Sequence, residues 1–514
     1  MEPLVTFLAI TASPPRLGDN IADLDRLRRA AAEQLQGVEP RVVWARSASV
    51  AAAFRAAGFV GTAVINHPPE GPELVDFLPD PPTGLVAMAL DLGTTHLEAT
   101  LLDLSSGAQL AKAHQENSQI RFGADILSRV HHASTPGGLA ALHGAVIGDI
   151  NGLARRLAGA AGIDVAAIRG LSVAGNTAMT HFLLNLDPYH LIREPYIPQV
   201  NVVEPPAAGE LGLAIHPAAP VWVLPSVGSY FGGDLVAGVL ACGLAGSEEV
   251  TMLIDVGTNA EVIVGNRDWL MACAGAAGPA LEGGVARMGM RAGPGAIDHV
   301  EFDPDSGGLR YTTIGGERPR GICGSGVIDL AAALYLGRII DLKGKFRPAA
   351  AGSRLVDSPD GPALVVAPAA EAADGRPVLF AQTDLDAVMR SKAAMYAILT
   401  TLLNQVGVKP EDLSRIYVAG AFGKHIDPRR AITLGMLPDL PPATFVPVGN
   451  SSLAGAELVL RDGAARRAAR ELVRKITYLE LNVNQEFMLR FSGSRFIPHT
   501  DQRLFPSVPF FKDS

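Results

Sequence analysis

Short apolar runs alternate with amphipathic segments near the amino end of the chain. Three runs have the length and composition typical of β-strands: residues 4–10, 41–44 and 62–66. Two segments space their apolar residues as one face of an α-helix does: residues 21–36 and a second segment that starts at Val50. The pattern predicts a small α/β domain over residues 1–67.

Prolines are concentrated in the segment that follows this domain. Six of them lie between His67 and Thr83: Pro68, Pro69, Pro72, Pro79, Pro81 and Pro82. Such a density of proline stiffens a chain into extended conformations. The pattern therefore predicts a linker and domain boundary over residues 68–84.

One local pattern occurs twice after the linker. In each copy an apolar strand ends in an acidic residue, a glycine turn follows, and a second and third strand come next. The first copy contains Asp91-Leu92-Gly93-Thr94-Thr95, and the second contains Asp255-Val256-Gly257-Thr258-Asn259. Because the interval between the copies is the size of a domain, the pattern predicts an internal duplication with lobes at residues 85–245 and 246–514.

The repeated turn has the chemistry of a phosphate site. Successive backbone N–H groups and a hydroxyl exposed on one side of a turn bind anions. The candidate phosphate-binding residues are Gly93, Thr94, Thr95, Gly257, Thr258 and Asn259. A carboxylate at the same place would repel phosphate unless it held Mg²⁺, usually through water, so Asp91 and Asp255 are candidate magnesium-binding and catalytic residues.

Glu261, after the second turn, is a further candidate. Its carboxylate can polarise water or bind the metal through water, but its position along an alternating strand is equally compatible with a solvated face.

Two more strand–turn–helix patterns carry glycines that would let a ligand approach the backbone. The first contains Gly175, Asn176 and Thr177, and the second contains Gly420, Ala421 and Gly423. Between the first pattern and the linker, Asp125 and Arg129 lie four residues apart, a spacing that predicts an ion pair on a helix.

The order of these motifs resembles that of the actin, sugar kinase and heat-shock chaperone (ASKHA) superfamily. The resemblance implies two ribonuclease-H-like α/β lobes with ATP between them. The resemblance assigns the two acidic turns, residues 91–95 and 255–259, to binding of the phosphates. It assigns residues 175–177 to the connecting segment, and Gly420, Ala421 and Gly423 to binding of the adenosine.

Finer motifs look like those of the ATP-dependent reductive activators of corrinoid proteins. They lie at residues 122–129, 175–188, 278–284, 321–326, 449–456 and 478–484. The resemblance implies an ATPase that drives electron transfer to inactive Co(II), restoring Co(I) on a corrinoid protein or cobalamin-dependent methyltransferase. It also suggests a homodimer.

Residues 1–67 resemble the middle domain of that family. The ferredoxin-like [2Fe–2S] domain of the family does not precede them, and the three cysteines, Cys242, Cys273 and Cys323, are too few for a standard four-thiolate cluster. We expect no iron–sulfur cluster in this chain and a separate low-potential electron donor, a ferredoxin or a flavoprotein.

Composition and charge narrow the expected partners and the expected location of the protein. With 43 basic and 52 acidic residues and no block of like charge, nucleic acid is not an expected partner. No apolar run reaches the roughly 20 residues that a membrane span needs, and the amino end lacks a basic signal region, so we expect a cytoplasmic protein without a membrane segment.

Two alternatives remain open at the level of the sequence. One is a small-molecule kinase of the same fold, with Asp234 as the candidate base. The other is a nucleotide-gated scaffold that binds ATP without turnover.

Overall fold

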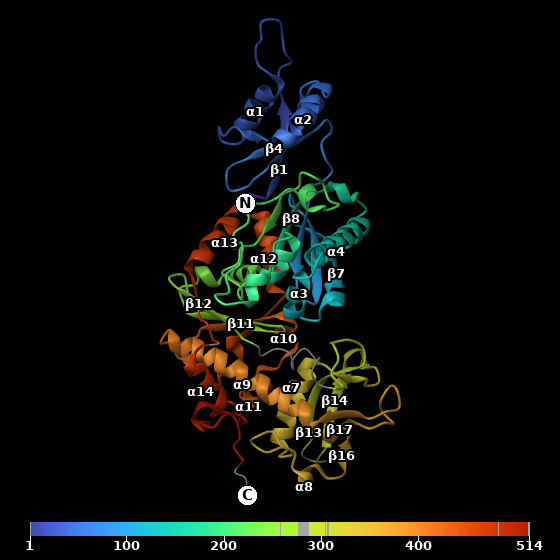
Figure 1. Cartoon of the computed structure of the whole chain (residues 1–514), viewed down its shortest axis with the longest axis vertical. Helices are drawn as coiled ribbons and strands as arrows, with labels where there is room; N and C mark the ends of the chain where they lie inside the picture. Colours follow the sequence, from blue (N-terminus) through green and yellow to red (C-terminus); the bar gives the residue numbers. More distant parts are fainter. Residues whose placement is uncertain are drawn as a thin grey trace. The chain divides into compact units, whose positions relative to one another are not determined.

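The computed structural model describes residues 2–257, 259–275, 287–303, 305, 308–481 and 483–511, without the side chains of Ala421, Phe422 and Lys424. The chain forms two compact units (Figure 1). Unit 1 comprises Met1–Ala241 and Ser451–Lys475, and unit 2 comprises Cys242–Asn450 and Ile476–Ser514. No helix within the described ranges is both long and apolar enough to cross a lipid bilayer.

Unit 1 begins with a small α/β domain. Its four-stranded sheet has the order β1-β3-β4-β2, with β1 at Val5–Thr11, β2 at Arg41–Val42, β3 at Val60–Asn66 and β4 at Glu73–Leu78. Helices α1 (Asp23–Gln34) and α2 (Trp44–Ala56) bury Leu27 and Phe54 against the sheet. The strands and helices correspond to the apolar runs of the sequence, except that α2 begins six residues before Val50.

Strand β4 corrects the prediction of a linker over residues 68–84. It pairs with β3 and β2 and so belongs to the domain sheet. Leu74, Val75 and Phe77 are buried. The prolines lie on both sides of this strand, where their missing N–H groups interrupt no ladder, so they delimit β4 rather than exclude it.

The main sheet of unit 1 has five strands in the order β7-β6-β5-β8-β9. They are β5 (Val86–Leu92), β6 (His96–Asp103), β7 (Gln109–Glu116), β8 (Ile168–Gly175) and β9 (Val221–Val223). The first three form an antiparallel meander, and β8 and β9 are parallel to β5. Helices α3 (Ile126–Ala133), α4 (Gly138–Ala161), α5 (Thr177–Leu183) and α6 (Gly233–Ala241) complete this part.

Both faces of β5 are buried. Met88 and Leu90 pack in one cluster with residues of α4, whereas Ala87 and Ala89 pack in another cluster with Leu453. The alternation follows from the period of two residues in a strand, and it explains why β5 reads as a continuous apolar run.

Unit 2 repeats the same sheet. Its order is β20-β19-β10-β11-β12-β21, with β10 (Thr251–Val256), β11 (Ala260–Gly265), β12 (Leu270–Gly275), β19 (Arg415–Ala419), β20 (Phe445–Gly449) and β21 (Ile476–Tyr478). Strands β10, β11 and β12 form the meander, and β19 and β20 are parallel to β10. The duplicated α/β fold predicted from the repeated turn is therefore confirmed.

The remaining elements of unit 2 are helices and two small sheets. Its helices are α7 (Gly324–Leu336), α8 (Pro348–Ala351), α9 (Gln382–Gln405), α10 (Gly420–His425), α11 (Pro428–Leu434) and α14 (Gln485–Gly493). Two small sheets have the orders β14-β13-β15 and β16-β17-β18. Their strands are β13 (Ala296–Asp303), β14 (Gly308–Thr313), β15 (Gly321–Ile322), β16 (Leu355–Ser358), β17 (Gly361–Ala367) and β18 (Val378–Ala381).

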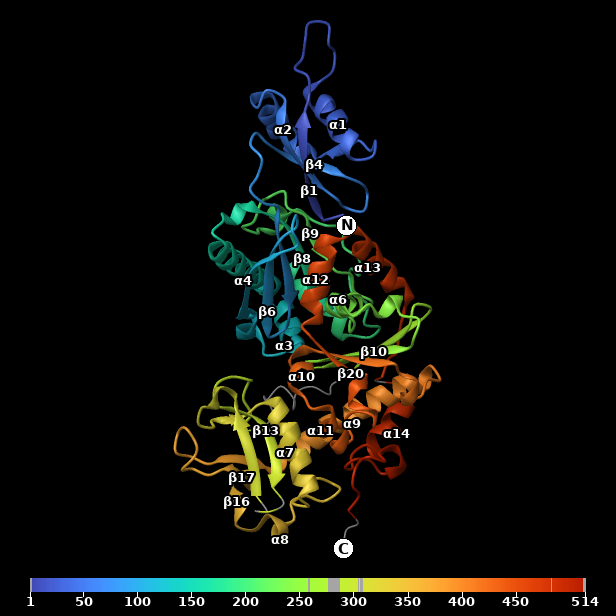
Figure 2. The ribbon, with the colours of Figure 1, turned by 180° about the vertical axis from the view of Figure 1, so that it is seen from behind.

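Two late helices return to unit 1. The sequence pattern assigns residues 246–514 to the second lobe, but α12 (Ser451–Arg461) and α13 (Gly463–Lys475) belong to the first unit. Figure 2 shows α12 and α6 side by side next to β8. The apolar face of α12 is evident in the sequence, but the spacing of apolar residues does not say which sheet that face covers.

Helices α12 and α6 approach closely at Gly455. A Cβ added there would lie 2.2 Å from the carbonyl oxygen of Ala237. We predict that Gly455→Ala lowers the free energy of unfolding by about 1–3 kcal/mol, as other overpacked cores do. Gly148→Ala on α4, where an added Cβ meets nothing within 4 Å, is the control and should be neutral or stabilising. Equal effects in denaturant unfolding would contradict this packing.

Asp76 of β4 ties the small domain to the main sheet of unit 1. Its carboxylate contacts Arg46 at 3.1 Å, Arg169 of β8 at 2.9 Å and His216 at 3.3 Å. Burial alone would raise the pKa of Asp76, but hydrogen bonds and charge from His216 and Arg169 outweigh it and hold that pKa below its ordinary value.

This contact predicts a pH-dependent loss of stability in Asp76→Asn. A depressed carboxyl pKa stabilises the fold above the unfolded value of about 4, and the contribution is lost as the pH falls through the folded pKa. The variant should therefore be less stable than the parent at pH 7, and the difference should shrink on acidification below about pH 4. Unfolding curves of both proteins from neutral to acidic pH measure this difference in stability. A difference that grows in acid would contradict the stabilising role of the Asp76 carboxylate.

Candidate functional site

The first acidic turn lies at the end of β5, beside the end of β8. In the parallel register Asp91 is opposite Ala174, and Leu92 is opposite Gly175. The carboxyl ends of adjacent parallel strands share one edge of a sheet, which is where α/β proteins bind ligands. A Cβ at Gly175 would lie 2.9 Å from the carbonyl oxygen of Leu92, so glycine permits this close approach.

The carbonyl oxygens of the turn are bound from inside unit 1. Asn117 donates from Nδ2 to Gly93 O at 2.9 Å and from its backbone N to Thr95 O at 2.8 Å. Arg129 donates to Thr94 O at 2.8 Å. Because C=O and the next N–H point in opposite directions across a trans peptide, the N–H groups of residues 94–96 point away from these donors. The turn thus has the form of an anion-binding nest.

Arg129 is a residue whose role the sequence pattern does not reveal. Its spacing from Asp125 predicts an ion pair, but Asp125 caps α3 by accepting from Ser128 N at 2.7 Å. Arg129 is fully buried and also donates to Gly123 O at 2.9 Å. Burial lowers the pKa of its guanidinium. A buried arginine that binds turn carbonyls positions the turn.

Asn176 joins the second glycine turn to the first. Its Oδ1 accepts from Met179 N at 3.0 Å and caps α5, and its Nδ2 donates to Thr94 Oγ1 at 2.9 Å. The cap fixes the orientation of the amide, so the Thr94 hydroxyl is the acceptor in this bond. Its own proton can then be donated to a phosphate oxygen.

Asp234 lies beside the same turn. A Cβ added at Gly232 would be 2.5 Å from Asn176 Cα and 2.8 Å from Asp234 Oδ1. Thr177 donates to Gly228 O at 2.6 Å and holds the loop that leads to α6. The residues predicted as a connecting segment, Gly175, Asn176 and Thr177, thus contact both the first acidic turn and the start of α6.

The carboxylate of Asp91 is held by a late helix. Ser452, in the first turn of α12, donates from Oγ to Asp91 Oδ1 at 2.9 Å. Ser452 is buried, whereas Asp91 is half-buried at the sheet edge. Sequence spacing alone does not pair these residues, because they are separated by most of unit 2.

The second acidic turn has the same surroundings in unit 2. Asp255 is opposite Ala419 of β19 in the parallel register, and Gly420 follows with a φ of 77°. A Cβ at Gly420 would lie 2.9 Å from Val256 O and 3.1 Å from Asp255 Oδ1. Gly420 therefore occupies in unit 2 the position that Gly175 occupies in unit 1.

The rest of the predicted adenosine segment follows Gly420 in α10. A Cβ at Gly423 would be 2.1 Å from Val418 O, so this glycine is required by the close turn. Gly257 N donates to Asn259 O at 2.9 Å and closes the hairpin. Thr258 and the motif at residues 278–284 lie outside the described residues, as does the side chain of Ala421.

Glu261 lies directly opposite Asp255 in the β10–β11 register. Directly opposed residues share one face of a sheet, so the two carboxylates lie on the same face. The duplication extends to this pair, because Glu98 is opposite Asp91 in unit 1 and forms an ion pair with Lys112 at 2.8 Å.

These residues fit a magnesium nucleotide. Mg²⁺ in nucleotide sites usually keeps several waters and takes one or two carboxylates together with the phosphates. Asp91, with one oxygen held by Ser452, and Asp255 are suitable carboxylates. Within the described part of the chain, no three His, Cys, Asp or Glu side chains form a metal-binding group, and a water-mediated site does not need one.

The cysteines have the properties of small apolar side chains. Cys273 and Cys323 are buried and Cys242 is half-buried. Burial, with a smaller effect from the Asp255 charge, raises the pKa of Cys242 to about 12. This thiol is therefore not ionised at neutral pH. Because the thiolate is the form that binds metals and attacks electrophiles, Cys242 is a poor ligand and a poor nucleophile.

Comparison with known proteins gives two family matches. A model described as the C-terminal domain of RACo, the ASKHA domain, matches residues 249–509. A second, described as the RACo middle region, matches residues 86–247. The middle region of the family is thus the first lobe, which corrects the assignment of that name to residues 1–67.

Similar whole proteins are known as well. The corrinoid activation enzyme RamQ of Eubacterium limosum is 32% identical, over 81% of this chain and 72% of that protein. The Co(II) methylated amine-specific corrinoid protein reductase of Methanosarcina barkeri is 26% identical, over 76% and 73%. A solved reductive activator for corrinoid, iron-sulfur protein matches with a TM-score of 0.90 and 38% identity, over 99% of this chain and 81% of that one.

The dual role of Asn176 predicts separable effects of two variants. Asn176→Asp keeps the capping oxygen but replaces the donor to Thr94, whose hydroxyl would then donate to the new carboxylate. We expect ATP affinity to fall about tenfold, the size of one hydrogen bond to a charged group, with little change in stability. Asn176→Ala should lose affinity and also about 0.5–2 kcal/mol of stability, because the cap is removed.

Isothermal titration with Mg·ATP and denaturant unfolding measure the two quantities. Unchanged ATP affinity in Asn176→Asp would contradict the proposed use of the Thr94 hydroxyl.

Proposed function

The chain belongs to the RACo family, and from this premise we propose that it is an ATP-dependent reductive activator of a corrinoid protein. In the proposed reaction, inactive Co(II) corrinoid on a partner protein takes up one electron and becomes Co(I). Binding and hydrolysis of ATP drive this unfavourable transfer. The partner is a corrinoid protein or a cobalamin-dependent methyltransferase.

The repeated acidic turn is the observation that carries the nucleotide part of the proposal. In both units the first strand of an equivalent sheet ends in an aspartate and a glycine turn, and a second glycine turn lies beside it. A nucleotide with several phosphates gives each turn an anion to bind. Bound Mg²⁺ would neutralise the β- and γ-oxygens.

Each residue then has a specific task. The N–H groups of Thr94 and Thr95, with the Thr94 hydroxyl, would bind phosphate oxygens in unit 1, and Thr258 and Asn259 would do so in unit 2. Gly93 and Gly257 would shape these turns, because their N–H groups donate to His96 O and Asn259 O. Asp91 and Asp255 would hold the magnesium through water. Glu261, on the same face as Asp255, would orient a water molecule. Gly420 and Gly423 would leave room for the adenosine.

In this proposal the electron comes from outside these 514 residues. Three cysteines, of which two are buried, do not form a four-thiolate cluster. A separate low-potential donor, a ferredoxin or a flavoprotein, would supply the electron, and the cobalt of the partner would accept it.

Coupling requires that the nucleotide state change the contacts made with the partner. The Ser452–Asp91 hydrogen bond offers a route within unit 1, because it links the magnesium-binding carboxylate to the first turn of α12. A change in the nucleotide at Asp91 would be felt at this helix. Displacement of a cobalt ligand in the partner would then make Co(II) easier to reduce.

The decisive experiment follows the visible spectrum of a Co(II) corrinoid protein with a low-potential donor. We predict that Co(I) forms only when this chain, Mg²⁺ and ATP are all present, with release of free phosphate. Asp91→Asn and Asp255→Asn should each slow Co(I) formation at least about tenfold, since each removes a charge facing the metal. Ser452→Ala should have a smaller effect in the same direction.

Asp164→Asn is the matched control. Asp164 caps a short helix before the opposite end of β8 and should leave the rate unchanged. Reduction that does not depend on ATP would contradict the proposal. ATP consumption that yields a phosphorylated small molecule in place of free phosphate would instead identify a kinase.

A further inference from the structure

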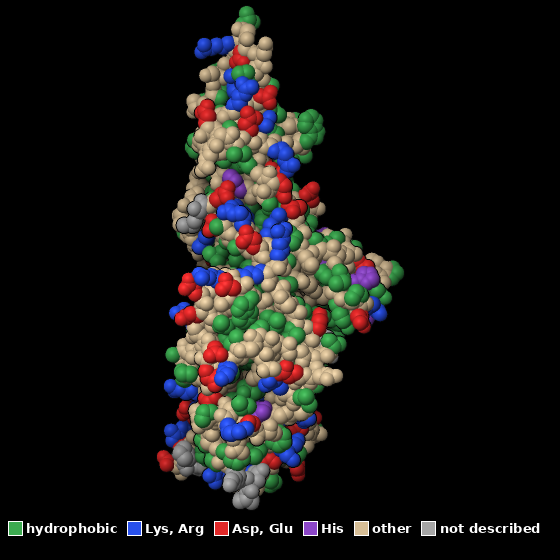
Figure 3. Space-filling model, turned by 90° about the vertical axis from the view of Figure 1, so that its left-hand side faces the viewer, with side chains coloured by type: hydrophobic (Ala, Val, Ile, Leu, Met, Phe, Trp, Pro, Cys, Tyr) green, Lys and Arg blue, Asp and Glu red, His purple; other side chains and the backbone are tan. Residues whose placement is uncertain are grey.

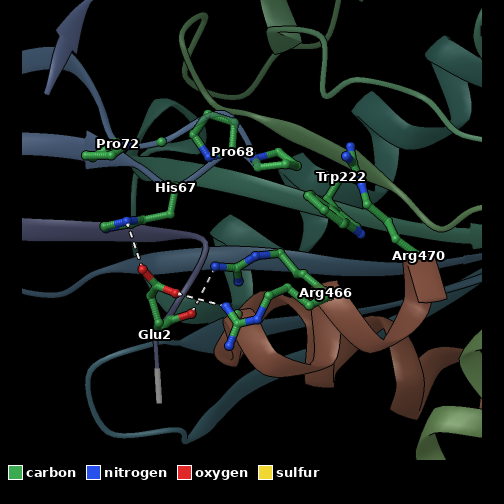
Figure 4. Close-up of a pocket in the computed structure, with 11 residues that line it drawn as sticks. Glu2, His67, Pro68, Pro72, Trp222, Arg466 and Arg470 are labelled. Atoms are coloured by element: carbon green, nitrogen blue, oxygen red, sulfur yellow. Dashed lines mark hydrogen bonds and ion pairs between the residues drawn. The ribbon is translucent and has the colours of Figure 1, made fainter.

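Unit 1 contains a second site of interest, and neither acidic turn contributes a residue to its lining. A cavity of about 250 Å³ opens where the small domain meets β9 and α13 (Figure 4). Its lining includes His67 and Pro68 from the loop after β3, Trp222 of β9, and Arg466 and Arg470 of α13. The proposed function uses none of these residues.

Arg466 is a buried cation in the wall of this cavity. Only 4% of its surface is exposed. Its guanidinium donates to three backbone carbonyl oxygens, those of Val459 at 2.8 Å, Glu2 at 3.0 Å and Pro3 at 3.4 Å. Burial lowers the pKa of Arg466 to about 10, against a smaller opposing effect of the Glu2 charge. Carbonyl groups do not neutralise a buried charge, which is therefore available to an anion.

Two further features make the cavity suitable for an oxyanion. The indole of Trp222 makes cation–π contacts with both Arg466 and Arg470, whose guanidinium carbons lie 5.9 and 5.4 Å from the ring centroid. Arg470 binds Glu204 through Nη2 alone, at 3.1 Å from each carboxylate oxygen. The other nitrogens of its planar fork can bind a second oxyanion.

The lining has an excess of positive charge. Among the lining residues, Arg466, Arg467 and Arg470 outnumber the single acidic side chain, that of Glu2. Outside the lining, Glu204 pairs with Arg470 and interacts with Glu70. Burial lowers the pKa of His67 and favours its neutral form. Glu2 contacts His67 at 3.5 Å and Arg467 at 3.7 Å. Over α13 the surface mixes basic with acidic side chains (Figure 3), so the excess belongs to the cavity rather than to a broad basic face.

We propose that this cavity binds a small phosphate-type oxyanion between Arg466 and Arg470. Its volume lies just below the range of pockets for drug-sized ligands, which suits inorganic phosphate or a short phosphate ester better than a nucleotide. Such a ligand would contact residues of the small domain and of α13 together, and its binding would stabilise their association. Glu2 competes for the same cations.

Trp222 provides a local signal. Replacement of Trp44 and Trp269 by Phe leaves it as the single tryptophan of the chain. Titrations at constant ionic strength use inorganic phosphate, glycerol 3-phosphate and citrate, with chloride as the reference. We expect a saturable change in Trp222 emission with the phosphate probes and none with chloride. The comparison of phosphate with its ester tells which source the cavity prefers, and preference for citrate would overturn the phosphate assignment.

Paired variants separate binding from a structural effect. Arg470→Gln should weaken phosphate binding about tenfold, since a charged donor is lost. Glu204→Gln breaks the same ion pair but keeps the cation, so binding should be unchanged or tighter. Glu2→Gln should tighten binding by removing a competing carboxylate. Asp255→Asn should not alter the Trp222 signal, because this residue belongs to the nucleotide turn of unit 2.

The absence of saturable binding would overturn the proposal. Equal weakening in Arg470→Gln and Glu204→Gln would do so as well, because it would mean that the Arg470–Glu204 ion pair serves only the fold. Circular dichroism and thermal unfolding of each variant confirm that the comparisons are made on folded protein.

Discussion

The main sheet of each unit pairs its first and fourth strands in parallel, β5 with β8 in unit 1 and β10 with β19 in unit 2. The rest of the structure depends on this pairing. It brings Leu92 level with Gly175 in unit 1 and Asp255 level with Ala419 in unit 2. Two turns are thereby placed at one sheet edge, close enough that only glycine fits at the contact. The hydrogen bond from Asn176 to Thr94 and the position of Asp91 both follow from this registration. A shift of one residue would move the carboxylate to the opposite face of the sheet.

Buried guanidinium groups have two different uses in this chain. Arg129 binds the carbonyl oxygens of a turn and fixes the direction in which its amides point. Arg466 binds carbonyl oxygens near the start of the chain and leaves its charge beside a cavity. In both cases arginine suits the position because its planar donors reach several acceptors at once and its charge persists on burial. The two arginines differ in their surroundings, because Arg129 is enclosed by packed protein whereas Arg466 borders a cavity.

The amino-acid pattern predicts the duplicated sheet well, since a strand, an acidic residue and a glycine turn recur with the same flanking strands. It also predicts which glycines lie at close approaches, as Gly175 and Gly420 illustrate. What it does not reveal are contacts between residues distant along the chain. Nothing near Asp91 indicates Ser452, and the spacing of Asp125 and Arg129 suggests a local pair although the guanidinium reaches a turn. The sequence analysis misses β4 because it predicts a linker from the density of prolines. Those prolines lie on either side of the strand, and the apolar residues between them form it.

The return of α12 and α13 to unit 1 has a consequence for biosynthesis. Residues 1–241 leave the ribosome well before residue 475 is made, a delay of roughly 10–50 s at ordinary translation rates of about 5–20 residues per second. During that interval the sheet face that carries Ala87, Ala89 and Trp222 is packed against α6 but lacks α12. The nascent first unit therefore exposes apolar surface to solvent until residue 475 has been made. Its maturation is vulnerable to premature termination even when every residue of its central sheet has been translated.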